Sequence, residues 1–283
     1  MRVNVFRAGV EISQIINEAK SDGAAPMDNN YHFSRIAHRY RDLRTTDLEP
    51  ITFIARELSD LPWVEAADVG CGAGRYDLLL HEHLGERLHL TCADANSAML
   101  NALDRYLKGN GVRNFKTINA SAENLPLPDD ALDCMFSFNS VHHFSLRRFL
   151  EESARILKKG GYLFIYTRLQ QQNERNIWGQ YFHNFSRKES RLYGLSTFVE
   201  ALIATPGLRA KSVEHFKYRR ISDLDRLVEQ ARANHYSTFG LYQPEELEEA
   251  ILGFRRNIEC YFEDIHRVQW YDENVLFVIR KED

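Results

Sequence analysis

The sequence predicts an α/β fold in which short apolar strands alternate with helices. An apolar run at 63–69 is followed by closely spaced glycines and then by a helical pattern at 76–84. Three more apolar runs, at 88–94, 132–139 and 162–167, are separated by segments of helical character. Strands that alternate with helices usually pair in parallel and are covered by those helices. We therefore expect a largely parallel sheet between helical layers.

Three alternating glycines mark the turn between the first strand and its helix. Gly70, Gly72 and Gly74 have no Cβ, so the backbone can bend tightly and approach a ligand closely. The start of the following helix offers unpaired N–H groups and a partial positive charge. Such a turn is typical of a nucleotide site, although a glycine-rich turn of this kind also occurs without a ligand.

The second predicted strand ends in an acidic residue, Asp94, which follows Gly74 by about 20 residues. A carboxylate at the tip of this strand can accept two hydrogen bonds from ribose hydroxyls. This spacing strengthens the prediction of a nucleotide site and makes Asp94 its ribose-binding residue.

Four segments in chain order resemble motifs of the class I S-adenosylmethionine (SAM) methyltransferases, in particular the small-molecule enzymes of types 11 and 25. The glycine motif matches at 68–74, and the motif after the second strand matches at 94–100. The adenine-side motif matches at 121–127, and a Lys-Lys-Gly-Gly step matches at 158–161. The resemblance implies SAM as the cofactor. It also implies a Rossmann-like, seven-stranded, mostly parallel sheet with an antiparallel last strand, helices on both faces and a helical cap.

The resemblance also assigns cofactor-binding positions. They are Tyr40, Arg44, Asp68, Gly70, Cys71, Gly72, Gly74, Asp94, Ala95, Ser121, Ala122, Glu123 and Asn139. Two positions depart from the family pattern, since Asn96 stands where Ser is usual and Ser121 stands where Asp is frequent. The Ser121 hydroxyl can accept the adenine amino hydrogen bond in place of Asp, but more weakly, because a charge-assisted bond is stronger.

The chain divides into three parts in this interpretation. Residues 1–47 form an N-terminal helical lid, 48–170 form the SAM-binding core, and 171–283 complete the sheet. In the last part, an insertion around 221–264 is expected to form a substrate cap. The elements expected there are helices at 173–185, 195–204, 222–233 and 244–264 and strands at 210–218 and 274–279.

Two histidines and a set of aromatic residues are the candidates for chemistry on the acceptor. His142 and His143 follow the fourth strand, where imidazole could act as a general base or merely pack against the cofactor. The candidate substrate-binding aromatics are Tyr31, Tyr166, Trp178, Tyr181, Phe182 and Tyr236. The alternative for these aromatics is ordinary core packing.

Composition narrows the class of partner. The 283 residues carry a formal net charge of −4, which disfavours nucleic acid as the substrate. The four scattered cysteines, the absence of a secretory signal and of an apolar run of about 20 residues favour a cytoplasmic protein, with no membrane partner. No metal-binding spacing is present. Composition leaves the oligomeric state open.

The function expected from these observations is transfer of a methyl group from SAM to O, N or C of a small organic molecule, possibly a secondary metabolite. Two alternatives remain at this stage. One is an RNA or protein methyltransferase, and the other is a SAM-binding regulatory protein without catalysis.

Overall fold

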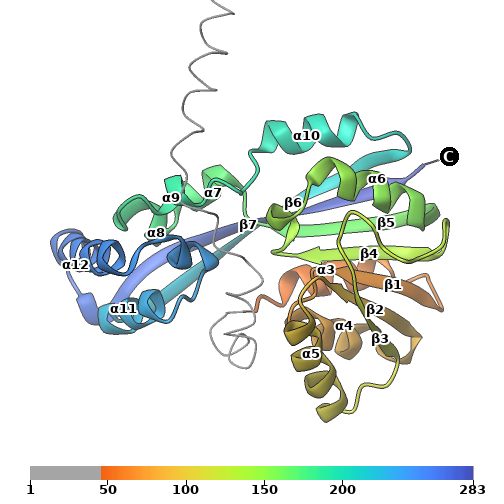
Figure 1. Cartoon of the computed structure of the whole chain (residues 1–283), viewed down its shortest axis with the longest axis horizontal. Coiled ribbons are helices and arrows are strands. Elements are labelled where there is room, and N and C mark those ends of the chain that lie inside the picture. Colours follow the sequence, from red (N-terminus) through yellow and green to blue (C-terminus); the bar gives the residue numbers. More distant parts are fainter. Residues whose placement is uncertain (1–45, 283) are drawn as a thin grey trace, which may run out of the picture.

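The computed structural model describes residues 46–282, which form a seven-stranded sheet in the order β3-β2-β1-β4-β5-β7-β6 (Figure 1). Strands β1 to β5 pair in parallel, and β7 runs antiparallel to both β5 and β6. The strands are β1 (Val64–Val69), β2 (Leu88–Asp94), β3 (Phe115–Asn119), β4 (Leu132–Phe138), β5 (Leu157–Thr167), β6 (Leu208–Ser222) and β7 (Val268–Lys281). The predicted Rossmann-like sheet with an antiparallel last strand is confirmed.

Helices cover both faces of the sheet. One face carries α3 (Glu49–Glu57), α4 (Arg75–Leu84) and α5 (Ser97–Gly109), and the other carries α6 (Leu146–Ile156) and α10 (Leu195–Ile203) (Figure 1). The central strands are buried on both sides, which explains why they read as continuous apolar runs and do not alternate. Two apolar cores result, one between each helical layer and the sheet.

Strands β6 and β7 are longer than the sequence predicts and form a ribbon that leaves the sheet. Pairing between β5 and β7 ends at Thr167 and Val275, whereas pairing between β6 and β7 continues to Ser222 and Val268. Only two strands run side by side over this extension, so its side chains alternate between exposed and half-buried. The sequence predicts strands at 210–218 and 274–279 only. We call this two-stranded extension the β6–β7 ribbon.

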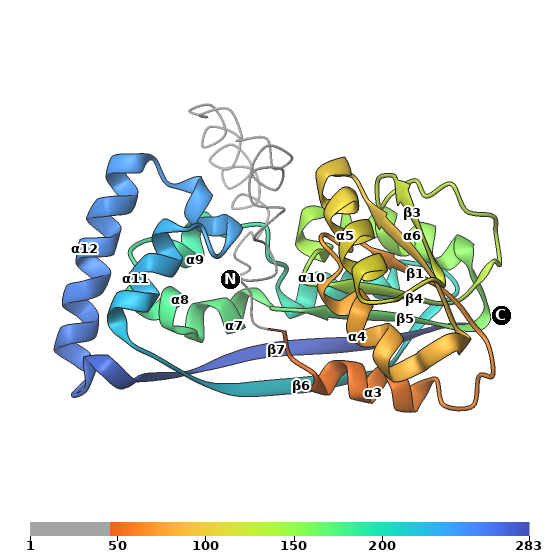
Figure 2. The ribbon, with the colours of Figure 1, turned by 90° about the horizontal axis from the view of Figure 1, so that it is seen from below.

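The ribbon carries a cluster of helices beside the sheet, which we call the cap (Figure 2). It contains α7 (Gln170–Arg175), α8 (Ile177–Tyr181), α9 (Phe185–Lys188), α11 (Leu224–Arg232) and α12 (Pro244–Tyr261), with the segments that join them, including the short 3₁₀ helix η3 (Ser237–Leu241). The two helices expected at 222–233 and 244–264 are present with slightly shorter bounds. Asp223 caps the first of them by accepting a hydrogen bond from the Arg226 amide, at 2.8 Å.

The single helix expected at 173–185 is wrong, because the segment forms three short helices. Asn176 has an extended backbone between α7 and α8, and its side chain accepts a hydrogen bond from the Gly179 amide at 2.8 Å. Asn184 adopts a left-handed conformation with φ of 58° before α9. Asparagine favours such caps and turns over helix interiors, and the apolar periodicity did not reveal these breaks.

An aromatic core holds the cap together. The Trp178 indole stacks on Phe254 with ring centroids 4.9 Å apart and meets Phe239 edge-on at 5.1 Å. Apolar side chains of α8, α11 and α12 close around it, and Trp178 is 2% exposed. The cap therefore has its own core, separate from the two cores of the sheet.

The N-terminal part of the predicted organisation cannot be placed in this fold. Residues 1–45 of the helical lid expected at 1–47, and with them Tyr31, Tyr40 and Arg44, lie outside the described residues. Among residues 46–282, no helix is long and apolar enough to cross a membrane. Over the same residues, no group of three His, Cys, Asp or Glu side chains is arranged to hold a metal ion.

We expect Trp178→Ala to destabilise the cap by about 3–5 kcal/mol, since it empties the centre of an aromatic core. Hydrogen exchange should quicken in α8, α11 and α12 but not in β1 or β4. Trp63→Ala is the matched control, because Trp63 is 52% exposed, stacks over His89 and donates one exposed hydrogen bond to Glu65. Equal loss of protection in the sheet and the cap would contradict an independent cap core.

Candidate active site

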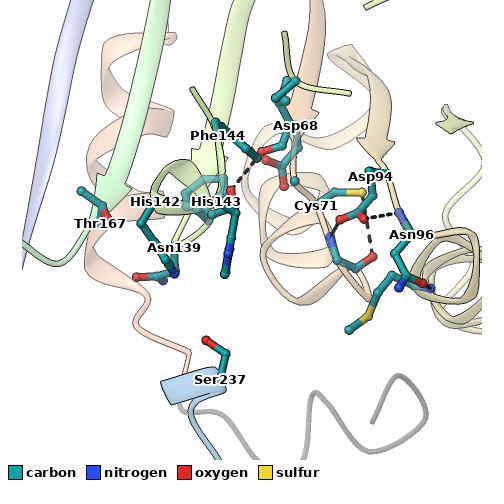
Figure 3. A pocket seen from close by; sticks show the side chains of 18 of the residues that line it. Asp68, Cys71, Asp94, Asn96, Asn139, His142, His143, Phe144, Thr167 and Ser237 are labelled. Atoms are coloured by element: carbon teal, nitrogen blue, oxygen red, sulfur yellow. Dashed lines mark hydrogen bonds between the residues drawn. The ribbon is translucent and has the colours of Figure 1, made fainter. Parts of the chain in front are cut away.

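A cavity of about 510 Å³ lies at the carboxyl ends of the parallel strands. The residues that end or follow β1, β2, β4 and β5 form one wall, and residues of the cap form the other. Figure 3 shows Asp94 and Asn96 on one side of this cavity, His142 and His143 on the other, and Ser237 of the cap facing them across the opening. Ligands of open α/β sheets bind at this edge.

The glycine loop, residues 70–74, forms the floor of the cavity at the end of β1. Gly70, Gly72 and Gly74 have φ angles of 74°, 56° and 83°, a region that favours glycine. A Cβ on Gly70 would lie 2.6 Å from the Ser140 Cβ, so the loop packs against the end of β4 without room for a side chain. A Cβ on Gly74 would lie 3.0 Å from Leu103 of α5. Only glycine permits this close approach.

Asp94 ties the glycine loop to the second strand. One carboxylate oxygen accepts a hydrogen bond from the Gly72 amide at 2.9 Å, and the other accepts one from the Asn96 amide at 2.8 Å. Burial raises the pKa of the Asp94 carboxyl, although these two amides lower it in part. Each oxygen keeps a further lone pair for a ligand hydroxyl.

Asn96, the departure from the family pattern, is the N-cap of α5. Its side-chain oxygen accepts hydrogen bonds from the Ala98 and Met99 amides at 3.0 and 3.1 Å. Asparagine and serine cap helices about equally well, so the exchange preserves the start of the helix.

The opposite end of this wall is formed by the segment after β3. The Ser121 hydroxyl hydrogen-bonds the Glu123 carboxylate, and Glu123 also accepts a bond from the Ser145 amide at 2.7 Å. Ser121 uses its hydrogen on Glu123 and accepts a long hydrogen bond from the Glu123 amide at 3.4 Å, so its oxygen keeps one lone pair as an acceptor. Pairing with a carboxylate strengthens that acceptor, which compensates in part for the missing Asp.

Two acidic side chains lie buried beneath the glycine loop. Asp68 and Asp77 are 1% and 0% exposed, and the Cys92 thiol donates to Asp77 at 3.2 Å. Burial raises the pKa of Asp77 to about 7 and that of Asp68 well above its usual range. The burial of Asp77 could have been predicted from the sequence, because Asp77 shares a helix face with Leu80 and Leu84, which are buried.

The histidine pair lies where β4 ends. Asn139 precedes it with a left-handed φ of 53° and donates its amide to the Tyr166 carbonyl at 2.7 Å. The rings of His142 and His143 are 4.1 Å apart between centroids, and both residues line the cavity. A strained residue at this position turns the chain so that the pair faces the cavity.

The cavity is also lined by polar side chains that the sequence analysis missed. Arg168 follows β5 directly, and Glu189, Ser237 and Thr238 reach the cavity from the cap. Glu189 is buried and pairs with Arg191 at 2.7 Å while the Thr238 hydroxyl donates to it. For Arg168 a signal existed, since residues just after a parallel strand face the ligand edge of the sheet. No sequence pattern placed Glu189, Ser237 and Thr238 at the cavity, because the position of the cap depends on the length of the ribbon.

The structure brings most of the predicted site residues to the cavity. Its lining includes Asp68, Gly70, Cys71, Gly72, Asp94, Ala95, Ser121, Ala122, Glu123, Asn139, His142, His143 and Tyr236. Gly74 lies behind it, against α5. Of the predicted aromatics, Trp178, Tyr181 and Phe182 belong to the cap core. Tyr166 is buried at the end of β5, where its hydroxyl donates to Asp47 at 3.1 Å.

Comparison with known proteins places this arrangement in a family. Residues 67–165 match the family described as a methyltransferase domain. Residues 67–165 therefore form a domain of the SAM-dependent methyltransferase family.

The relatives cover only part of the chain. An uncharacterised methyltransferase of Bacillus subtilis, YcgJ, is 30% identical over 137 residues, which are 48% of this chain and 53% of the relative. The ubiquinone/menaquinone C-methyltransferase UbiE of Vibrio cholerae is 34% identical over 106 residues, 37% of this chain and 41% of the relative. The chain thus spans about half the length of the curated relatives it matches. The crystal structure of YcgJ shares the fold, with a TM-score of 0.59 at 16% identity over 83% of this chain and 99% of the other.

The residues present fit SAM, the cofactor of this class. The backbone of the glycine loop itself forms the floor, because a Cβ on Gly70 would collide with Ser140. Asp94 offers two oxygens at the expected ribose position, and the cavity is within the range of small-molecule sites. Ala95, Ala122 and Met99 line the side toward which the adenine would extend.

We expect Asp94→Asn to weaken binding of S-adenosylhomocysteine, the demethylated cofactor, by at least about tenfold. A hydrogen bond to a charged group contributes about 1.5–3 kcal/mol, and the variant loses the charge that strengthens two of them. Isothermal titration calorimetry measures the affinity. Asp104→Asn, on the exposed side of α5, is the control. A folded Asp94→Asn protein with unchanged affinity would remove Asp94 from the cofactor site.

We expect Asp77→Asn to gain stability relative to the native chain as the pH rises from about 4 to about 7. The unfolded carboxyl loses its proton near pH 4, whereas the folded one keeps it to about 7. The native chain therefore loses up to about 1.4 kcal/mol per pH unit in this window, and the uncharged Asn avoids that loss.

Urea unfolding of both proteins across this pH range measures the difference. Asp104→Asn reports how much of the trend follows from removing any carboxylate. A difference that does not vary with pH would show that Asp77 ionises alike in the folded and unfolded chains.

Proposed function

We propose that the chain transfers the methyl group of SAM to an O, N or C atom of a small organic molecule. The observation that carries this proposal is the enclosed cavity in which the cofactor wall faces the histidine pair and the polar cap residues (Figure 3). A cavity of about 510 Å³ shared by cofactor and acceptor suits a small acceptor better than a protein or RNA segment.

The chain's own residues contribute binding, orientation and exclusion of water. When bound, SAM supplies an electrophilic methyl group on a sulfonium. Asp94 and the glycine loop hold the nucleoside, and the end of β4 with Asn139 holds the region where the methyl group would point. The cap covers this region, which keeps water out and aligns the acceptor for in-line attack.

His142 and His143 are the proposed bases for an acceptor that carries a proton. Both face the cavity, and imidazole titrates near neutral pH. An acceptor atom that is already nucleophilic would need no base, and the pair would then serve to pack against the cofactor. We also propose that residues 1–47 act as a lid and that the 221–264 region acts as part of the substrate cap.

Transfer of label from SAM distinguishes the proposed function from two alternatives. A catalytically silent regulator would bind S-adenosylhomocysteine but transfer no label from SAM to any molecule of a cell extract. An RNA or protein methyltransferase would label a macromolecular fraction instead of small molecules. A cytoplasmic location remains a prediction.

We expect His142→Ala and His143→Ala to bind S-adenosylhomocysteine like the native chain, while the variant lacking the base loses about 100-fold or more in turnover. Labelled SAM and a small-molecule extract provide the assay. His215→Ala, on the exposed side of β6, is the control. Full turnover by both variants would show that neither histidine is the base.

A further inference from the structure

A second, more polar cavity of about 280 Å³ adjoins the first. It lies where the β6–β7 ribbon and the cap meet the end of β5, and its charged lining consists of five arginines and two aspartates. The wall between the two cavities is shared, since Arg75, Tyr76, Asn139, Arg168 and Tyr236 line both. A ligand in the first cavity therefore lies next to the second.

Two of the arginines are held in place by carboxylates. Asp272 lies 3.1 Å from Arg168 and 3.3 Å from Arg220, and Asp47 lies 2.6 Å from Arg220. Their side chains are between 7% and 19% exposed, so these charges are largely removed from water. Buried charges held in this way are rigid and preorganised for a further partner.

The positive charge of this cavity exceeds what its two aspartates can balance. Arg219 hydrogen-bonds the neutral Gln269 side chain, and Arg226 makes no ion pair with any residue in 46–282. Donors are also in excess. Arg168 Nε, Trp270 Nε1 and Ser222 Oγ are buried on residues of this lining, and no described residue accepts a hydrogen bond from them. Against these three groups stands one buried carboxylate oxygen of the lining that receives no hydrogen bond from a described residue, Asp272 Oδ1, which lies 3.1 Å from the Arg168 guanidinium. Buried donors normally have acceptors, so the site lacks an anionic group.

We infer that the arginine cavity binds an oxyanion of the methyl acceptor, a carboxylate or phosphate group, while the rest of the acceptor extends past Tyr236 to the histidine pair. Planar guanidinium groups pair with such oxyanions through two parallel hydrogen bonds. This inference rests on the proposed function, because it assigns the class of acceptor for that reaction. It makes Arg168 and Arg226 specificity-determining residues.

The inference is tested by titrating the protein, saturated with S-adenosylhomocysteine, with benzoate, phenyl phosphate and the neutral benzamide. We expect at least one of the two anions to bind and benzamide to bind at least about tenfold more weakly, since a charged hydrogen-bonded pair is lost. The preferred anion distinguishes a carboxylate from a phosphate.

The variants Arg226→Gln and Arg168→Gln should both weaken binding of the anion. Arg226→Gln should leave the affinity for S-adenosylhomocysteine unchanged, because Arg226 lines only the second cavity. Arg226 is on the exposed side of α11, so its variant should fold even if loss of the buried Arg168 destabilises the chain. Arg187→Gln in α9 is the matched control, because Arg187 lines neither cavity.

Four results would overturn the inference. Benzamide could bind as well as the anions, neither anion could bind at millimolar concentration, or Arg226→Gln could leave anion binding unchanged. Loss of S-adenosylhomocysteine affinity in Arg226→Gln would also overturn it, because the cavity would then hold the carboxylate of the cofactor. A native chain that does not bind S-adenosylhomocysteine at all would refute the proposed function itself, which is measured separately.

Discussion

The ion-pair chain Asp47–Arg220–Asp272–Arg168 is the interaction on which the geometry of the site depends. It joins the segment before α3, both strands of the ribbon and the end of β5, four parts of the chain far apart in sequence. Removing one member would leave a buried charge unpaired, which is costly. The four parts are therefore held in one arrangement, and the cap is set over the carboxyl ends of the strands.

The two walls of the site are built by different physical means. The cofactor wall depends on backbone geometry, with positive φ angles, a Cβ-free contact at Gly70 and amide bonds to Asp94. The cap wall depends on side chains held by an aromatic core and the ion pairs of the ribbon. Backbone geometry leaves a short, local pattern in sequence, whereas long-range side-chain contacts do not.

That difference explains what could be predicted from the sequence. The sheet, the glycine loop and Asp94 follow from local patterns, and the structure contains them as expected. The three short helices at 170–188 could not be predicted, because Asn caps interrupt an otherwise helical pattern. The length of the ribbon could not be predicted either, because its strand ends lie in segments with a turn-like pattern. Arg220 could not be placed, since its partners Asp47 and Asp272 are 173 and 52 residues away.

Acidic and basic side chains lie at opposite ends of the site. The Asp94 carboxylate lies at the cofactor wall, and Arg168, Arg220 and Arg226 line the second cavity beyond Tyr236. Burial favours the neutral forms of Asp68 and Asp77, so Asp94 carries the negative charge of this wall. A cationic sulfonium is attracted toward the acidic end, and an oxyanion is attracted toward the arginines. In a cavity of low dielectric both attractions are stronger than in water. The two reactants would thus be drawn to opposite ends, with their reacting atoms meeting between them at Asn139 and the histidine pair.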